Sequence, residues 1–167
     1  IGWYFSDRSR CQRLLGRTAE AADDAAQALT AAEASGEPEL ICAAHLACAW
    51  VCWDRGDVEA LEAHLAQMER HEPDAGAPRW TTQRLLITMQ LRVRSGALEE
   101  ARHLGLRGLE LAGAHDQHAT MAQLHHTMSV VSRELGHLDA AIEHCEKAMG
   151  LYEGLGDTLE GAGARND

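Results

Sequence analysis

One stretch of the chain concentrates cysteine and histidine at intervals that could support metal binding. Cys42, His45, Cys48 and Cys52 follow one another three or four residues apart. Such intervals place side chains on adjacent turns of a helix, so His45 and Cys48 could offer nitrogen and sulfur ligands to zinc. The alternative is a packing role, because a free cysteine behaves as a small hydrophobic residue and the paired short spacings of structural zinc sites are absent. We expect these residues to pack between helices, with no metal and no cofactor.

The chain also holds ten histidines, and the densest groups are 115–118 and 125–126. Histidine titrates near neutral pH and is a common metal ligand, so these groups could form a pH-responsive or metal-binding corner. No three of the histidines fall on a recognised ligand spacing. We therefore expect a loop between helices at 115–118 and an exposed helix flank at 125–126.

Catalytic patterns are missing from the sequence. His71-Glu72 is followed by Pro73, which rules out the helical metalloprotease motif. The chain has neither a phosphate-binding glycine loop nor a nucleophile elbow. Ser129 and Ser132 fall within predicted helices, where a hydroxyl usually bonds its own backbone. We expect that this protein is not an enzyme.

Arginine and tryptophan are the remaining side chains whose chemistry suits recognition. Arg10 and Arg13 stand three residues apart, as do Trp50 and Trp53. Arginine can form two hydrogen bonds to a carboxylate or phosphate, and tryptophan supplies flat apolar area with one donor. This pairing is common at interface hot spots. The alternative for the two tryptophans is ordinary inter-helix core.

The elements that must position these side chains are helices that recur with a period of forty residues. The turn glycines of the repeat are Gly16, Gly56, Gly96 and Gly136. Links between repeats hold glycine or proline at Gly36, Pro38, Gly76, Pro78, Gly113 and Gly156. Glycine after a helix and proline in a first turn are the expected punctuation. We predict eight helices in four hairpins, at 2–15, 18–34, 38–55, 58–71, 78–95, 98–113, 118–135 and 138–154.

Small residues recur on the second helix of each hairpin, at fixed positions after the turn glycine. Five residues after it stand Ala21, Leu61, Ala101 and Ala141; nine after, Ala25, Leu65, Gly105 and Cys145; twelve after, Ala28, Met68, Gly108 and Ala148. Small residues spaced by three and four on one face let two helices approach closely. One hairpin cannot bury its apolar faces alone, so the hairpins must stack.

These residues resemble the tetratricopeptide repeat family. Leu135-Gly136, Ala141 and Ala148 look like its turn and second helix, and the resemblance covers nearly the whole chain. It implies an all-α fold, a right-handed α-solenoid of four antiparallel hairpins that forms a superhelix. The chain departs from the family in its period of forty rather than thirty-four. Its first helices also lack the usual aromatic and glycine, with Phe5, His45, Leu85 and His125 in one such column and Ser9, Ala49, Met89 and Ser129 in another.

Long repeats of this kind are similar to arrays in large bacterial LuxR-type regulators related to the maltose regulator, and in signalling ATPases. The family resemblance further implies that first helices line the concave surface, where a stripe at i, i+3, i+7 and i+10 faces inward. The predicted binding residues on this surface are Arg10, Arg13, Trp50, Trp53, Gln90, Arg94, His126 and Arg133. We expect a protein or peptide ligand that is acidic with an apolar anchor, or a small anionic effector.

Charge is divided between the two helices of the hairpins. The fifteen residues ending at each turn glycine hold eight basic and three acidic residues, and the nineteen after it hold five basic and seventeen acidic. The division favours a basic recognition face on the first helices. The alternative is that opposite charges bridge first helices to second helices.

Composition limits the partners further. A formal net charge of −11 disfavours direct nucleic-acid binding and docking on anionic membranes. No apolar run approaches the roughly 20 residues of a membrane span, and the first residues do not form a signal peptide. Five cysteines without a framework spacing suit a reducing compartment, and we expect a cytoplasmic protein.

The sequence predicts a single repeat domain over 1–167, with repeats at about 1–36, 37–76, 77–116 and 117–156. Residues 157–167 are expected to begin a further repeat, and the absence of an initiator methionine suggests a segment of a longer protein. The apolar edge of helix 138–154 is then exposed or covered by a neighbour, including a second copy of the chain. We expect a protein- or peptide-binding module; the alternative is the effector-sensing segment of a multidomain bacterial regulator or signalling ATPase.

Overall fold

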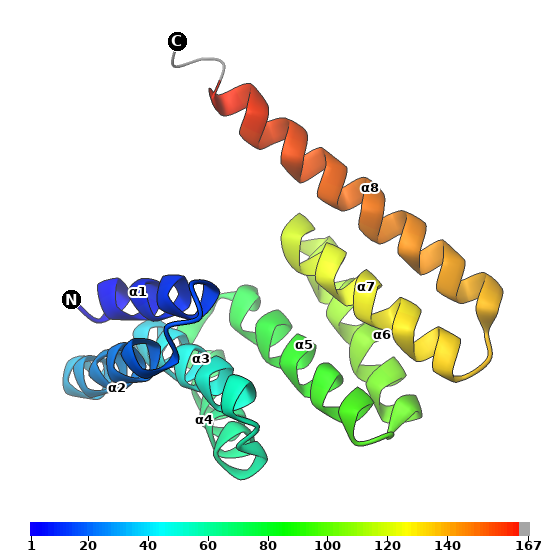
Figure 1. Cartoon of the computed structure of the whole chain (residues 1–167). Helices are drawn as coiled ribbons and strands as arrows, with labels where there is room; N and C mark the ends of the chain where they lie inside the picture. The colour runs from blue at the N-terminus through cyan, green and yellow to red at the C-terminus, as the bar shows by residue number, and fades with distance from the viewer. Residues whose placement is uncertain (164–167) are drawn as a thin grey trace. The chain divides into compact units, whose positions relative to one another are not determined.

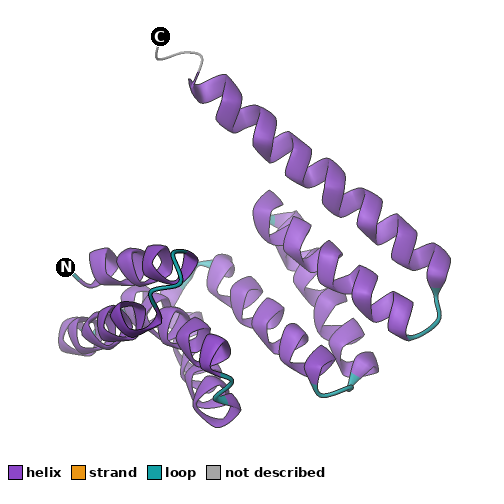
Figure 2. Ribbon diagram, viewed as in Figure 1, coloured by secondary structure: helices purple, strands orange, loops and turns teal. Residues whose placement is uncertain are grey.

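The computed structural model describes residues 1–163, with side chains described as far as Gly156, and contains no strand within that range. The all-α prediction is confirmed (Figures 1 and 2). The helices are α1 (Gly2–Leu14), α2 (Thr18–Ser35), α3 (Pro38–Arg55), α4 (Val58–Ala75), α5 (Pro78–Arg94), α6 (Leu98–Ala114), α7 (His118–Glu134) and α8 (Leu138–Gly163). Among these helices, none combines the length and apolar character needed to cross a bilayer.

Two predicted helix ends were too early. Helix α4 continues past residue 71 and includes Pro73, ending at Ala75. A proline in the last turn removes one backbone donor, and the helix then closes with the Gly76 N–H bonded to the Glu72 carbonyl at 3.2 Å. Helix α8 runs through Gly156 to Gly163 instead of ending at 154. Glycine inside a helix costs only about 1 kcal/mol, so it does not force an end.

The four turn glycines and the link glycines Gly36 and Gly76 adopt left-handed backbone conformations. The φ angles of Gly16, Gly36, Gly56, Gly76, Gly96 and Gly136 lie between 63° and 81°. No atom lies within 4 Å of the place where a Cβ would stand at any of them, so the backbone conformation and not crowding selects glycine. The prediction that Gly113 lies in the link between α6 and α7 was wrong. Gly113 lies inside α6, and Asp116 takes the left-handed position in the link, with φ 51°.

The chain forms two compact units, Ile1–Arg84 and Leu85–Asp167, and the boundary falls within α5. In the first unit α1 packs on α2 and α3, α2 packs on α3, and α3 packs on α4. The buried cores between α2 and α3 consist largely of alanine, with Ala25 beside Cys48 and Val51, and Ala28 beside Ala44. Such small side chains bring the two helix backbones close together.

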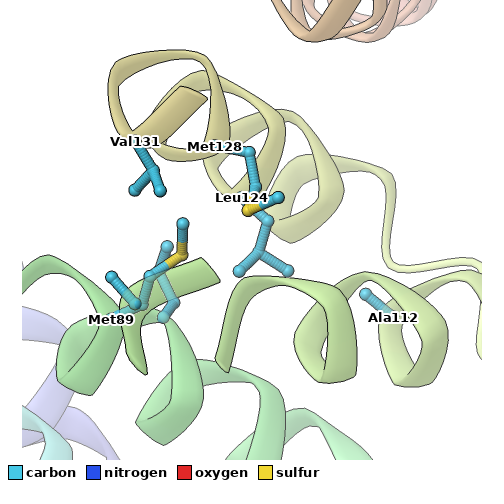
Figure 3. Packing of buried hydrophobic residues seen from close by; sticks show 7 residues of the cluster. Met89, Ala112, Leu124, Met128 and Val131 are labelled. Atoms are coloured by element: carbon cyan, nitrogen blue, oxygen red, sulfur yellow. The ribbon is translucent and has the colours of Figure 1, made fainter. Parts of the chain in front are cut away.

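In the second unit, α7 packs on α6 and on α8. Leu124, Met128 and Val131 of α7 point toward α5 and α6, where they meet Met89 and Ala112 (Figure 3). Two glycines of α6 make room for them: a Cβ on Gly105 would overlap the Met128 sulfur, and one on Gly108 would lie 3.0 Å from a Leu124 methyl. The predicted role of the small-residue columns in close helix approach is confirmed here.

Several ion pairs join first helices to second helices. Arg8 of α1 pairs with Asp24 of α2, and the Arg92 Nε of α5 lies 2.9 Å from the Glu100 carboxylate of α6. The Asp24 side chain is only 4% exposed, and the guanidinium of Arg8 holds the pKa of that carboxyl below its usual range. Part of the charge separation seen in the sequence therefore serves to bridge helices, as the alternative interpretation predicted.

Candidate functional site

Four residues of the first unit form a polar and aromatic cluster on the first helices α1 and α3. Arg13 of α1 donates from Nε to Asp54 Oδ2 at 2.5 Å and from Nη2 to Oδ1 at 2.9 Å. Its guanidinium carbon lies 5.0 Å from the ring centroid of Trp50, which is cation–π distance. The rings of Trp50 and Trp53 meet edge to face with centroids 6.3 Å apart. We call Arg13, Trp50, Trp53 and Asp54 the Arg13–Trp50 cluster.

Helix periodicity explains how these residues meet. Trp53 and Asp54 follow Trp50 by three and four residues near the end of α3, so both lie on the same side of that helix as Trp50. Arg13 occupies the last turn of α1, which packs beside α3. Both tryptophans are half-buried, and the Arg13 and Asp54 side chains keep 17% and 30% exposure. The cluster is thus held in place by neighbouring helices while part of its aromatic surface faces solvent.

A second aromatic group in the first unit was missed by the sequence analysis. The rings of Trp3 and Trp80 stack with centroids 6.1 Å apart, and the Arg79 guanidinium lies 4.5 Å from the Trp80 ring. Arg79 also pairs with Glu39 of α3, forty residues earlier. Trp80 is only 6% exposed and packs on Ala43, so this group joins the start of α5 to α1 and α3. The repeat period between Arg79 and Glu39 was the signal that could have revealed it.

The structure brings together three of the eight predicted binding residues, namely Arg13, Trp50 and Trp53. Arg10 is exposed on α1. The other four lie in the second unit: Gln90 is half-buried and Arg94 exposed on α5, and His126 and Arg133 are exposed on α7. The Arg133 Nη2 lies 3.0 Å from the carboxylate of its neighbour Glu134, which partly neutralises it.

The cysteine-rich stretch of α3 packs as predicted. Cys42 and Cys48 are buried, and their thiols point to the carbonyl oxygens of Met68 at 3.9 Å and Ala25 at 3.6 Å. Burial raises the pKa of Cys42 to about 11 and that of Cys48 to about 12. Both thiols therefore stay protonated at neutral pH. Because the thiolate is the form that binds metals or acts as a nucleophile, neither thiol is suited to those roles. Between residues 1 and 163, no three potential metal ligands gather in one place.

Two pairs of histidines link the first and second helices of alternate hairpins. The Nδ1 atoms of His45 and His64 are 3.0 Å apart between α3 and α4, and those of His125 and His144 are 2.9 Å apart between α7 and α8. The prediction of an exposed flank at 125–126 was therefore wrong for His125, which is 8% exposed, although His126 is exposed. Each pair spans nineteen residues, and the two pairs are related by eighty, twice the repeat period. That spacing was visible in the sequence.

The geometry of each pair limits its protonation. One Nδ1 must carry a hydrogen and the other must accept it, so the doubly protonated pair would place two N–H groups against each other. Burial lowers the pKa of His45 to about 4, helped by the nearby His64 and His71. Burial also lowers the pKa of His64, against the opposing effect of Asp57. In the other pair, burial lowers both pKa values; Lys147 adds to this effect and Glu143 opposes it.

Acidification is therefore expected to destabilise the fold. Unfolded histidine takes up protons near pH 6.5 and buried His45 only near pH 4, so the unfolded state binds more protons between these values and stability falls as the pH is lowered. At pH 5 the loss from His45 alone is about 2 kcal/mol relative to pH 7. Urea unfolding followed by circular dichroism at both pH values measures it.

The third hairpin shows which residues can replace the histidine pair in a test of this pH dependence. It carries Leu85 and Leu104 at the positions that correspond to His45 and His64. The double change His45→Leu and His64→Leu should therefore keep the fold and reduce the difference in stability between pH 7 and pH 5, whereas His126→Gln should leave that difference unchanged. An unaltered pH dependence in the double variant would show that the pair is not its source.

Comparison with known proteins adds no functional assignment. The chain matches no protein-family model, and no curated protein matches it.

Proposed function

We propose that this chain is a peptide-binding module built as a tetratricopeptide-like solenoid, with its recognition surface on the first helices. The observation that carries the proposal is the Arg13–Trp50 cluster. It combines two half-buried tryptophans with an arginine held over one of them, on two adjacent first helices. Residues of this type, partly desolvated and held in fixed orientation, are those that dominate binding energy at interfaces.

Contacts between equivalent first helices support the stacked arrangement in the first unit. Arg13 and Asp54 join α1 to α3, and Glu39 and Arg79 join α3 to α5, at separations of forty-one and forty residues. Contacts one repeat apart are what stacked hairpins produce. We also propose that the hairpins form a right-handed superhelix and that the Arg13–Trp50 cluster lies on its concave face.

The proposed ligand is an acidic peptide with an aromatic or aliphatic anchor. The anchor would contact the exposed parts of Trp50 and Trp53, which offer apolar area with little conformational entropy to lose. The Arg13 guanidinium is already held by Asp54, so a carboxylate of the ligand must compete for it. Arg10, exposed one turn earlier on α1, is better placed to supply charge attraction. Association should then slow as salt is added.

Selection from a random peptide library tests this proposal because it does not require the natural ligand to be identified. Peptides are selected on the immobilised chain and then titrated by fluorescence anisotropy. The expected peptides combine acidic residues with one large apolar residue. Trp53→Ala should cost about 2 kcal/mol of binding, close to thirtyfold in Kd, with unchanged helicity.

Leu106→Ala serves as the control, because it also truncates a large apolar side chain, but one that is 46% exposed and lies on the second helix α6. It should bind the selected peptides as the original chain does. Peptides that bind Trp50→Ala and Trp53→Ala with unchanged affinity would contradict the proposed site. Unfolding of both variants would show that the two rings are structural core.

A further inference from the structure

The outer face of α8 presents a continuous apolar stripe to solvent. Its members are Leu138, Ile142, Cys145, Met149 and Tyr152, separated alternately by four and three residues. Leu138, Ile142 and Met149 are 58–61% exposed, and Tyr152 is 47% exposed. Ala141 and Ala148 of the same helix, by contrast, are buried. We call the five exposed residues the α8 stripe; an apolar row of this length on one helix marks an interaction surface.

The other second helices show what such a face normally contacts. Cys145 stands nine residues after its turn glycine, the position of Ala25 in α2 and Gly105 in α6. Ala25 is 2% exposed because α3 covers it through Cys48, and Gly105 is buried beneath Met128 of α7. In both places the covering residue stands eight before the next turn glycine. The natural occupant of the α8 stripe is therefore a first helix.

Helix α1 offers the complementary face of a first helix, and it is uncovered in this chain. Tyr4, Arg8 and Cys11 correspond in the repeat to Leu124, Met128 and Val131 of α7, and Leu15 corresponds to Leu135 directly after α7. In α7 the first three are at most 2% exposed, because α6 covers them. Tyr4 on α1 is 59% exposed, Leu15 directly after α1 is 65% exposed, and Cys11 is also exposed. We call these four residues the α1 face.

Charge distinguishes between two copies joined stripe to stripe and two copies joined stripe to α1 face. Exposed residues of α8 include the acidic Asp139, Glu143, Glu146 and Glu153 and the basic Lys147. The α1 helix instead holds Arg8, Arg10 and Arg13 with a single acidic residue, Asp7. Two α8 stripes would bring like charges together. On α1, Arg8 and Arg13 are already paired with Asp24 and Asp54, so the exposed Arg10 is the arginine that meets the α8 carboxylates.

Arg8 is the one charged member of the α1 face, and its neighbours reduce the cost of covering it. Its Nε donates to Asp24 at 2.7 Å, so its charge is already balanced by a buried carboxylate. Its guanidinium carbon also lies 5.0 Å from the Tyr4 ring centroid, which extends the apolar surface over the charge.

We propose that the α8 stripe of one copy docks on the α1 face of a second copy, so that the protein associates head to tail. The contact repeats between molecules the packing that α2 makes with α3 and that α6 makes with α7 inside each molecule. Because the two joined surfaces differ, each dimer keeps one free stripe and one free α1 face, and longer assemblies follow as concentration rises. This inference is independent of the proposed peptide binding.

Two single-ended variants test the proposal by analytical ultracentrifugation under reducing conditions. One carries Ile142→Glu and Met149→Glu on α8, and the other carries Cys11→Glu and Leu15→Glu on the α1 face. All four sites are exposed, so each variant should keep the original helicity. The original chain should gain mass with concentration, each variant alone should remain a monomer, and their mixture should form a dimer and nothing larger.

The outcomes that overturn the proposal are distinct. A monomeric original chain at every concentration, or a mixture that stays monomeric, excludes the head-to-tail contact. Self-association of the α1 variant alone indicates a symmetric stripe-to-stripe dimer and also excludes it.

The native cysteines give a second measurement. Ala25 and Val51, which correspond to Cys145 and Cys11, belong to one core cluster between α2 and α3. Mild oxidation of the associated chain should therefore give Cys11–Cys145 links between copies, identified by mass spectrometry. Links restricted to Cys145–Cys145 would support the symmetric dimer instead and contradict the proposal.

Discussion

Replacing Arg84 by methionine is expected to lower the free energy of unfolding by about 3–5 kcal/mol. Arg84 donates from Nε to Glu72 Oε1 at 2.7 Å and from Nη2 to Oε2 at 3.1 Å, and its Nη1 lies 3.4 Å from Glu69. The Arg84 and Glu72 side chains are 14% and 7% exposed. Without the guanidinium, the Glu72 carboxylate stays buried with its countercharge removed. Chemical denaturation at pH 7 measures the loss.

Two comparisons separate the buried charge from simple loss of contacts. The double variant Arg84→Met and Glu72→Met removes both charges and should recover most of the lost stability, because no buried ion is left alone. Arg102→Met breaks the exposed pair with Glu99 one turn away on α6 and should cost less than about 1 kcal/mol. If the double variant is as unstable as Arg84→Met, the buried carboxylate is not responsible.

Replacing Gly105 by valine is expected to destabilise the second unit by about 2–3 kcal/mol. Its first added carbon already overlaps the Met128 sulfur and lies 2.9 Å from the Met89 methyl. Met128 is itself confined by Leu124 and its neighbours in a fully buried cluster, so the helices must separate or the methionines must leave their positions. Thermal and urea unfolding report the change.

The same unit offers a matched glycine and a compensating change. Gly150 is also within a helix, but no atom lies within 4 Å of its missing Cβ. Gly150→Ala should therefore raise stability by about 1 kcal/mol, since alanine favours the helix. Met128→Ala combined with Gly105→Val should recover part of the lost stability. Equal effects of the two glycine changes would mean that the α6–α7 contact is not tightly packed.

The repeat period made most of the fold predictable. Glycine and proline mark the helix ends, and the columns of small residues predicted a close helix approach, which Gly105 and Gly108 make possible where α6 meets α7. The prediction of helix ends failed where a proline or glycine is compatible with a helix although it does not favour one. Pro73 lacks a donor but fits the last turn of α4, and Gly156 merely weakens α8, so neither ends a helix.

The side-chain partners were less predictable than the helices. A stripe on one helix placed Trp50 and Trp53 together, but the contact of Arg13 with Asp54 depends on how α1 lies against α3. The pairing of His45 with His64 likewise joins residues of two helices, and no property of either histidine alone reveals the other. To predict such pairs, equivalent positions on both helices of a hairpin must be considered together and then compared across repeats.

Asp116 shows how such an array can diverge without changing shape. It stands at the position of Gly36 and Gly76 in the repeat and keeps their left-handed backbone with a side chain that tolerates it. A single-base change converts a glycine codon into an aspartate codon, whereas the alanine that another single-base change produces would be strained there. Mutation can therefore remove the glycine that most clearly identifies a repeat in the sequence, while selection on backbone geometry preserves the fold. Structural similarity among the hairpins would then persist after their sequence similarity is lost.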